Sequence, residues 1–99
     1  MLAADPYFRV MPPLEPPTLG DIVARNVAAE RVRRKLKQEE LAERLGWARS
    51  SVGHLESGRR KVTVSDLPAL CRALGVDLAV LLHGADPDDL HAMNVQAMK

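Results

Sequence analysis

The chain has 99 residues, of which 46% are hydrophobic and only 3% aromatic, and its formal net charge is +1. This length provides for one small domain and excludes a two-domain enzyme. No apolar run is long enough to cross a bilayer, the first residues lack the apolar stretch of a signal peptide, and a single cysteine cannot form an internal disulfide, so a soluble cytoplasmic protein is expected.

The charge is distributed unevenly along the chain. Residues 1–24 carry one arginine against three acidic residues, and residues 62–99 carry two Lys/Arg against five aspartates. Between them, residues 25–61 carry eleven Lys/Arg against five glutamates. A surface that faces a polyanion needs such a local excess, so this pattern favours nucleic acid over a membrane as the partner.

The N-terminal residues 1–19 are predicted to form an extended arm. Prolines remove backbone donors and bias the preceding residues towards extended conformations. Five of the seven prolines lie here: Pro6, Pro12, Pro13, Pro16 and Pro17. The apolar side chains of Tyr7, Phe8, Val10 and Met11 could pack on a partner or on the domain, but a flexible terminus is an equally good interpretation.

Helical periodicity begins at Thr18. Thr18 and Asp21, three residues apart, resemble the pair of residues that caps the N-terminus of a helix. A first helix is predicted over roughly Gly20 to Lys35. Its apolar positions at helical spacing are Leu19, Ile22, Val23, Val27, Val32 and Leu36.

Two shorter helices are predicted next, over Gln38 to Leu45 and over about Ala48 to Glu56. Gly46 ends the first of them, because glycine adopts the left-handed conformation without a side-chain clash. The second closes at Gly58.

The rest of the chain predicts a fourth helix capped within Thr63 to Asp66 and stopped by Gly75. A fifth helix is expected over about Asp77 to His83. Residues 85–99 form a C-terminal tail, in which Asp88 to Met98 is a candidate for a last weak helix.

The segment 38–58 carries the functional signal. Its two short helices and the turn between them permit one helix to lie in a major groove while the other crosses the backbone. Ala42 supplies the small side chain that a close helix crossing requires. The outward face of the second helix has no acidic residue and consists of Arg49, Ser50, Ser51, Gly53 and His54.

This segment resembles the Cro/phage-repressor family of helix-turn-helix proteins, often called XRE-like. The matching positions are Gln38, Leu41, Ala42, Gly46, Val52, Glu56 and Gly58. The similarity covers about residues 22–83 and implies an all-α, lambda-repressor-like bundle of about five helices over residues 20–84. It also implies a sequence-specific transcriptional regulator of double-stranded DNA, expected to be a repressor, that reads the major groove with helix 48–57. Neither an enzymatic activity nor a cofactor is implied.

The resemblance assigns roles to individual residues. Arg49, Ser50 and His54 occupy base-reading positions, and Ser51 one that meets phosphate or base. An arginine can donate twice to guanine, and a serine can bond several bases. Gln38 is expected to bond a phosphate and to position a reading side chain.

The backbone contacts are expected from Arg59, Arg60 and Lys61, which follow the reading helix. Gly53 either allows close approach of the DNA or is a tolerated exposed glycine, and His54 could instead be a solvated surface histidine. The basic residues whose role the sequence leaves ambiguous are Arg31, Arg33, Arg34, Lys35, Lys37 and Arg44.

Two positions depart from the family pattern. Ala48 stands where a Ser or Thr cap is common, so the recognition helix is expected to lack that cap. Trp47 occupies a turn position that usually holds a smaller aliphatic residue, and it is interpreted as a core residue rather than a base stacker.

The sequence gives little support to an enzymatic or metal-binding function and more to a protein-interaction module. Ser50, Ser51, His54 and Glu56 lie on different faces of one short helix and supply no catalytic pocket. Cys71 is interpreted as a small core residue, and His83, Asp86 and His91 lack metal-ligand spacing. The main alternative is a protein-interaction module, such as an antitoxin or anti-repressor, whose partner binds through the arm or the tail.

A regulator of this kind is expected to act as a homodimer on an approximately palindromic site and to associate with the nucleoid when bound. The dimer surface could be the fifth helix, the final segment or the arm.

Overall fold

Six helices make up the part of the chain that the structure, a computed structural model, describes, which is residues 16–95. The helices are α1 (Leu19–Arg33), α2 (Gln38–Leu45), α3 (Arg49–Ser57), α4 (Asp66–Leu74), α5 (Leu78–Leu81) and α6 (Pro87–Ala92). Within this part the fold is all-α and lambda-repressor-like, as predicted. The interpretation of residues 1–15 as an arm lies outside the described residues. The predicted last helix, Asp88 to Met98, is shorter than expected: α6 ends at Ala92, and Asn94 has a φ of 58° in the left-handed region, which a continuing helix does not allow.

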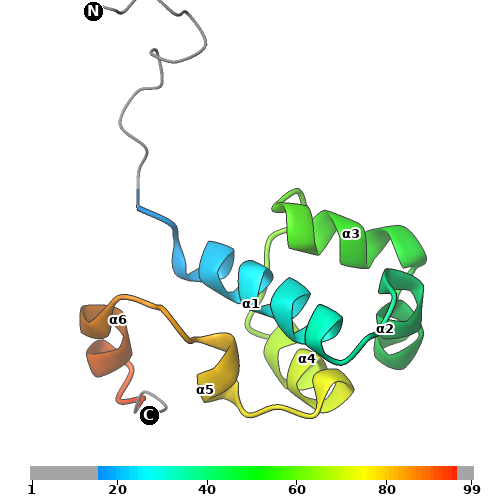
Figure 1. Ribbon diagram of the computed structural model, residues 1–99. Coiled ribbons are helices and arrows are strands. Elements are labelled where there is room, and N and C mark those ends of the chain that lie inside the picture. The colour runs from blue at the N-terminus through cyan, green and yellow to red at the C-terminus, as the bar shows by residue number, and fades with distance from the viewer. Residues whose placement is uncertain (1–15, 96–99) are drawn as a thin grey trace, which may run out of the picture.

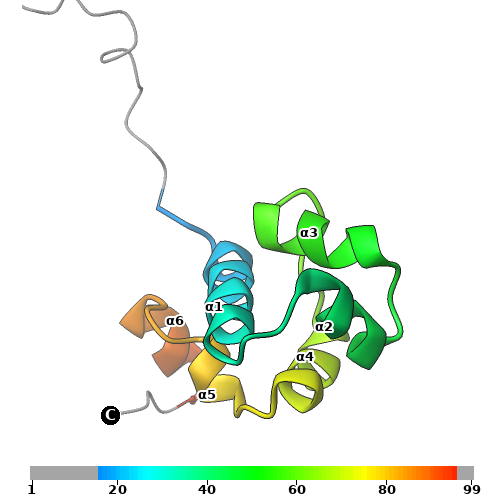
Figure 2. The same cartoon turned by 45° about the vertical axis from the view of Figure 1, so that its right-hand side comes forward.

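The helices pack around one core. Figures 1 and 2 show α1 running through the middle of the molecule, with α2 and α3 together at one end and α6 at the other end, beyond α5. Every helix from α1 to α5 contributes a buried side chain, and those that are fully buried are Val27, Leu41, Val52, Leu55, Leu70, Leu74 and Leu81. Leu90 and Val95 also pack against this core, so the C-terminal segment lies on the domain. The division of the chain at residues 19 and 84 stays a prediction.

Local hydrogen bonds fix where the helices begin. At α1, the Thr18 hydroxyl accepts from the Asp21 N–H, and the Asp21 carboxylate accepts from the Thr18 N–H at 2.9 Å. The bond from the Thr18 N–H lowers the pKa of the Asp21 carboxyl, because it favours the charged form, and the Thr18 side chain adds to the effect. The same reciprocal pair joins Thr63 and Asp66 before α4. The predicted cap of α1 is therefore confirmed. At α4 the Thr63–Asp66 pair forms within the predicted segment, but the N-cap residue of that helix is Ser65, which makes no side-chain cap hydrogen bond.

The first helix differs from its prediction at its C-terminal end. It ends at Arg33, and Lys35 has a φ of 57° in the left-handed region, so the predicted continuation to Lys35 was wrong. Val32, predicted on the inner face, is 62% exposed, because it lies five residues after the buried Val27 and is therefore turned about 140° away from it around the helix axis. Val32 instead lies beside Ala28 and Ala29 on an open surface.

The fifth helix is shorter than predicted, four residues against Asp77 to His83. It is nevertheless fixed firmly to α1. The Asn26 side-chain amide donates to the carbonyl oxygens of Leu81 at 2.7 Å and of His83 at 2.9 Å. These bonds use carbonyls at the end of α5 that have no helical partner.

Candidate nucleic-acid interface

The α2–α3 pair has the geometry that the sequence predicts for residues 38–58. The turn between the two helices is three residues long, and Gly46 adopts φ 72° there. The Trp47 N–H donates to the Ala42 carbonyl at 2.9 Å, and Ala42 itself is buried between the helices. The predicted bounds of α2, Gln38 to Leu45, are confirmed.

Helix α3 has one buried and one exposed face. Val52 and Leu55 are at most 1% exposed and fix the helix on the core. The opposite face presents Arg49, Ser50 and His54 to solvent, with the Arg49 side chain 79% exposed. Ala48 precedes the helix without a side-chain cap, as the sequence predicts. The structure thus brings together on one accessible surface the three side chains assigned to base reading.

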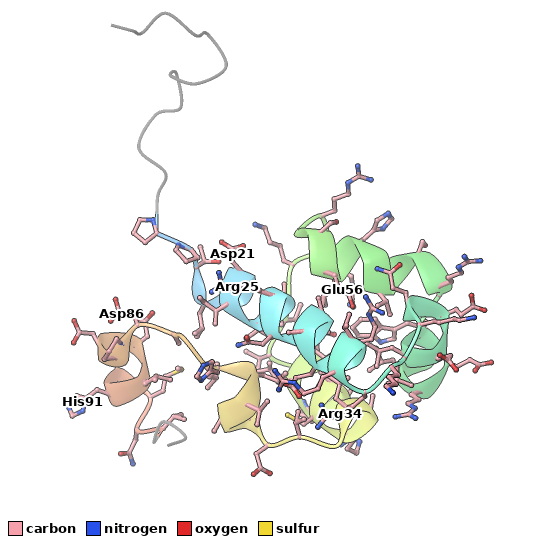
Figure 3. All side chains as sticks on the ribbon, in the orientation of Figure 1. Asp21, Arg25, Arg34, Glu56, Asp86 and His91 are labelled. Atoms are coloured by element: carbon pink, nitrogen blue, oxygen red, sulfur yellow. The ribbon has the colours of Figure 1, made fainter. Side chains whose placement is uncertain are left out.

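Glu56 is the centre of a hydrogen-bonded cluster between α3, α1 and α2, and Figure 3 marks it on the side of α3 that faces α1. Its carboxylate accepts from Arg31 Nε at 2.7 Å and from Arg31 Nη2 at 3.1 Å, while Arg31 Nη1 donates to the Leu36 carbonyl. Gln38 Nε2 donates to the same carboxylate at 3.0 Å. Only 8% of the Glu56 side chain and 15% of the Arg31 side chain are exposed, so this ion pair is largely desolvated.

The cluster explains two features of the surface. Glu56 is the only acidic residue of α3, and its charge is turned inward and neutralised by Arg31. Gln38 is held at the edge of α3 beside Gly53. A methyl group added at Gly53, as in an alanine, would lie 3.6 Å from Gln38 Oε1, which is an ordinary contact distance. Packing within the chain therefore does not require glycine at position 53.

Arg60 does not join Arg59 and Lys61 on the surface. Its guanidinium carbon lies 3.8 Å from the centre of the Trp47 ring, and its Nη2 is 3.3 Å from the Asp66 carboxylate. The Arg60 N–H also donates to the His54 carbonyl at 3.0 Å. Arg60 thus ties the loop after α3 to the α2–α3 turn and to α4, and the backbone-contact role expected of it from the sequence stays a prediction. Trp47 is half-buried and packs on the core, as expected.

Several residues of the basic stretch are engaged within the domain. Arg33 and Arg34 both pair with the buried Glu30, and Arg44 Nη1 donates to the Ala73 carbonyl at the end of α4. By contrast, no ion pair of Arg59 or Lys61 is found within residues 16–95, and both are exposed. Lys35 and Lys37 are exposed as well. The structure therefore separates the basic side chains that are engaged by partners within the domain from those that are exposed without an ion pair among residues 16–95, which the sequence left ambiguous.

The one cysteine, a candidate nucleophile, has a structural role in the described domain. Cys71 packs against the core, and burial raises the pKa of its thiol, with the nearby Asp77 adding to the effect. A higher pKa keeps the thiol protonated and a poor nucleophile. Residues 16–95 contain no group of three or more His, Cys, Asp or Glu that could hold a metal ion, and none of their helices is long and apolar enough to span a membrane.

Comparison with known proteins places this geometry in a family. A helix-turn-helix family model matches residues 27–81. Control protein C.SmaI of Serratia marcescens is 40% identical over 64 residues, which cover 65% of this chain and 76% of that protein. The crystal structure of the restriction-modification controller protein C.AhdI from Aeromonas hydrophila is 32% identical, with a TM-score of 0.57 over 64% of this chain and 94% of that one. The clp gene regulator ClgR from C. glutamicum is 28% identical, with a TM-score of 0.64 over 68% of this chain and 87% of that one. The chain therefore belongs to the Cro/phage-repressor type of the helix-turn-helix family, whose members are non-enzymatic, DNA-binding regulators of transcription.

Proposed function

We propose that the protein is a repressor that binds a two-fold symmetric DNA site as a homodimer, with α3 of each copy in the major groove. The observation that carries this proposal is the exposed face of α3, where Arg49, Ser50 and His54 project from a helix fixed on the core by Val52 and Leu55. A helix held in this way presents its side chains to base edges in a defined register.

The chemistry of the exposed face suits base reading. Arg49 can donate two parallel hydrogen bonds to guanine O6 and N7, and the Ser50 hydroxyl can both donate and accept. His54 donates or accepts in the groove, according to its protonation state. Because the Glu56 carboxylate is turned towards Arg31, α3 carries no exposed negative charge that would repel DNA.

The surrounding residues are suited to the sugar-phosphate backbone. The Gln38 amide is already oriented by Glu56, so it can meet a phosphate at the start of α2 without losing further rotamer freedom. Gly53 of α3 lies next to it, and the small Gly53 leaves room for close approach of a DNA strand. Ser51, on the same helix, carries a hydroxyl that can bond a phosphate or a base. Arg59 and Lys61 supply the exposed positive charge beyond the end of α3.

The salt dependence of DNA affinity should show which of the residues Arg59, Arg60 and Lys61 contact phosphates. Each phosphate contact contributes about 0.9 to the slope of log affinity against log salt concentration. We expect Arg59→Ala and Lys61→Ala each to reduce that slope by about this amount, with little change in sequence preference. Arg60→Ala is the matched control, because it removes the same charge from a side chain engaged with Trp47 and Asp66, and its slope should stay at the wild-type value. Equal slope changes in all three variants would contradict this assignment.

A homodimer follows from the size of the reading surface. One recognition helix covers only a few base pairs, and two-fold pairing places a second helix about 34 Å further along the same face of the duplex. A dimer bound across a promoter excludes other proteins from that DNA, which is the simplest route to repression.

Selection of bound duplexes from a random pool tests the proposal. The expected result is a two-fold symmetric motif with half-sites roughly 10 base pairs apart, and reduced transcription in vitro when that motif overlaps a promoter. Weak binding that yields no motif and disappears at moderate salt would contradict specific reading. A single half-site bound by one copy would contradict the dimer.

A further inference from the structure

Arg49 has one ion-pair partner within residues 16–95, and that partner comes from the other helix of the motif. Arg49 Nη2 lies 4.0 Å from Oε1 of Glu39, in the first turn of α2. Both side chains are exposed, 79% for Arg49 and 57% for Glu39. The Glu39 carboxylate therefore lies on the same accessible surface as the side chain assigned to guanine.

The charges of α2 and α3 give this carboxylate a distinct position. Glu40 accepts a hydrogen bond from the backbone N–H that precedes α2, and Glu56 is turned inward. Helix α3 begins at Arg49, with no acidic residue in its first turn and no side-chain cap from Ala48. Because the N-terminal end of a helix disfavours a cation, the negative charge of Glu39 stabilises the Arg49 guanidinium at this place.

We propose that Glu39 is a specificity-determining residue, which directs Arg49 to base edges and away from phosphates. The inference rests on the proposed function, in which Arg49 reads guanine. An exposed arginine beside DNA can bind a phosphate of any sequence, and such contacts add affinity without discrimination. A phosphate bound by Arg49 would lie within a few ångströms of the Glu39 carboxylate and be repelled by it, whereas guanine O6 and N7 are uncharged acceptors.

The geometry of the pair leaves Arg49 able to read a base. A guanidinium group has several N–H donors, and the contact of Arg49 Nη2 with Glu39 is longer than a hydrogen bond. Arg49 can therefore keep this electrostatic contact while it donates two parallel bonds to guanine. Exposed ion pairs contribute little to stability, and the two helices are held by buried side chains such as Leu41 and Val52. Removal of the Glu39 charge should thus change base discrimination and leave the fold intact.

Competition binding on the selected duplex tests the proposal. The specificity ratio compares the affinity for that duplex with the affinity for one in which a single base pair is exchanged, the pair at which Arg49→Ala loses its preference. Glu39→Gln should strengthen binding to the exchanged duplex and lower the ratio by roughly 2- to 5-fold, the range of an exposed ion pair.

Glu43→Gln is the matched control for Glu39→Gln. It removes the same charge from an exposed position one turn further along α2. The affinities for both duplexes should rise by the same factor, because a negative charge near DNA is removed, and the specificity ratio should stay at the wild-type value. If the two glutamine variants changed the ratio equally, Glu39 would have no special relation to Arg49 and the proposal would be overturned, while specific DNA reading would stand.

A double-variant cycle separates an effect through Arg49 from a direct contact with DNA. In the Arg49→Ala background, Glu39→Gln should leave the ratio at the exchanged base pair unchanged, because no arginine remains to be directed. A decrease of the same size in both backgrounds, or a loss of preference at a different base pair, would show that Glu39 acts on the DNA itself and would overturn the proposal. Failure to select any motif would overturn the proposed function, and this inference with it.

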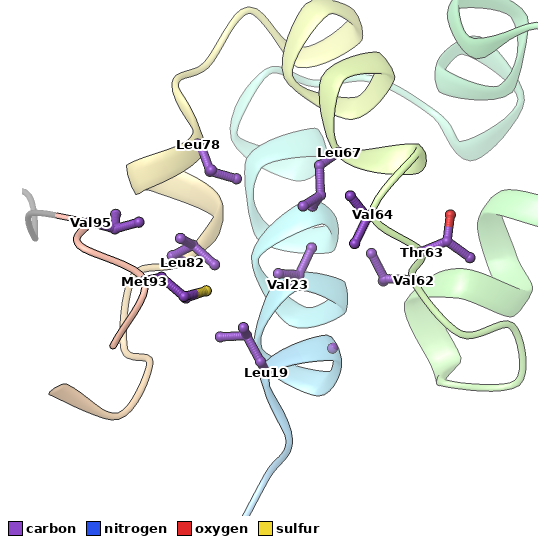
Figure 4. Close-up of a pocket in the computed structure, with 11 residues that line it drawn as sticks. Leu19, Val23, Val62, Thr63, Val64, Leu67, Leu78, Leu82, Met93 and Val95 are labelled. Carbon is purple, nitrogen blue, oxygen red and sulfur yellow. The ribbon is translucent and has the colours of Figure 1, made fainter. Parts of the chain in front are cut away.

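A groove on another part of the domain reports whether the variants keep the fold. Its lining is almost entirely apolar, its volume is about 170 Å³, and it lies between α1, α4, α5 and the residues after α6 (Figure 4). None of its lining residues belongs to α2 or α3. The methyl resonances of Leu78 and Met93, which line it, should coincide in the wild type, Glu39→Gln and Glu43→Gln. Resonances that shift in Glu39→Gln alone would assign its loss of discrimination to a changed fold and would overturn the proposal.

Discussion

Replacing Glu56 by alanine should reduce the free energy of unfolding by about 3–5 kcal/mol, the usual cost of breaking a buried ion pair from one side. The substitution leaves the Arg31 guanidinium largely buried without its carboxylate and removes the partner of the Gln38 amide. Because small domains have total stabilities of about 5–15 kcal/mol, the variant should be close to unfolding at room temperature. Urea denaturation followed by circular dichroism at the helical signal measures the difference.

The control for this prediction removes both charges. Arg31→Met/Glu56→Leu replaces the pair by apolar side chains of similar size, and such replacements are often neutral or stabilising. We expect the double variant to recover most of the lost stability but to bind DNA more weakly than the wild type, because Gln38 is no longer oriented. A double variant as unstable as Glu56→Ala would show that the cost comes from lost packing rather than from the unpaired arginine.

Arg49→Ala should weaken binding to the selected duplex by roughly 5- to 150-fold, which corresponds to the 1–3 kcal/mol of a good bidentate contact to guanine. The Arg49 side chain is 79% exposed, and its single ion pair, from Nη2 to the Glu39 carboxylate, is a weak surface pair at 4.0 Å. Loss of the Arg49 side chain should therefore hardly change the free energy of unfolding. Repeating the duplex selection with the variant should show that base preference is lost at one position in each half-site.

Arg72→Ala is the matched control for Arg49. It removes the same charge from an exposed position on α4 and should leave both affinity and motif close to the wild type. If Arg49→Ala weakened binding to all sequences by the same factor, Arg49 would be a phosphate contact, and base reading would rest on Ser50 and His54.

Sequence patterns predicted the helices best where strong local signals bound them. Helix α2 has the predicted limits because Gly46 stops it in the left-handed conformation. The Thr18 cap was identified because Asp21, which completes it, lies three positions away, and the hydrogen-bonded pair of Thr63 and Asp66 before α4 has the same spacing. The end of α1 and the length of α5 depend on tertiary contacts, such as the bonds from Asn26, and periodicity carries no information about these.

The side-chain partners of the site were harder to predict. The exposed face of α3 follows from helical spacing, so Arg49, Ser50 and His54 could be placed on it in advance. Glu56 was identified only as a family position, because its partner Arg31 lies 25 residues earlier and many arginines compete for the role. The partners of the Arg60 side chain were not predictable for the same reason. Three consecutive basic residues are equivalent in the sequence, and only the folded chain shows that Trp47 and Asp66 lie beside Arg60.

The position of the one tryptophan has a practical consequence. All tryptophan emission from this protein originates at Trp47, in the turn that joins the two motif helices and under the Arg60 guanidinium. Its fluorescence is therefore an intrinsic optical probe of the motif itself. Loosening of the loop after α3 would change the polarity around the indole, so the colour and intensity of the emission would follow that loop directly, without an attached dye.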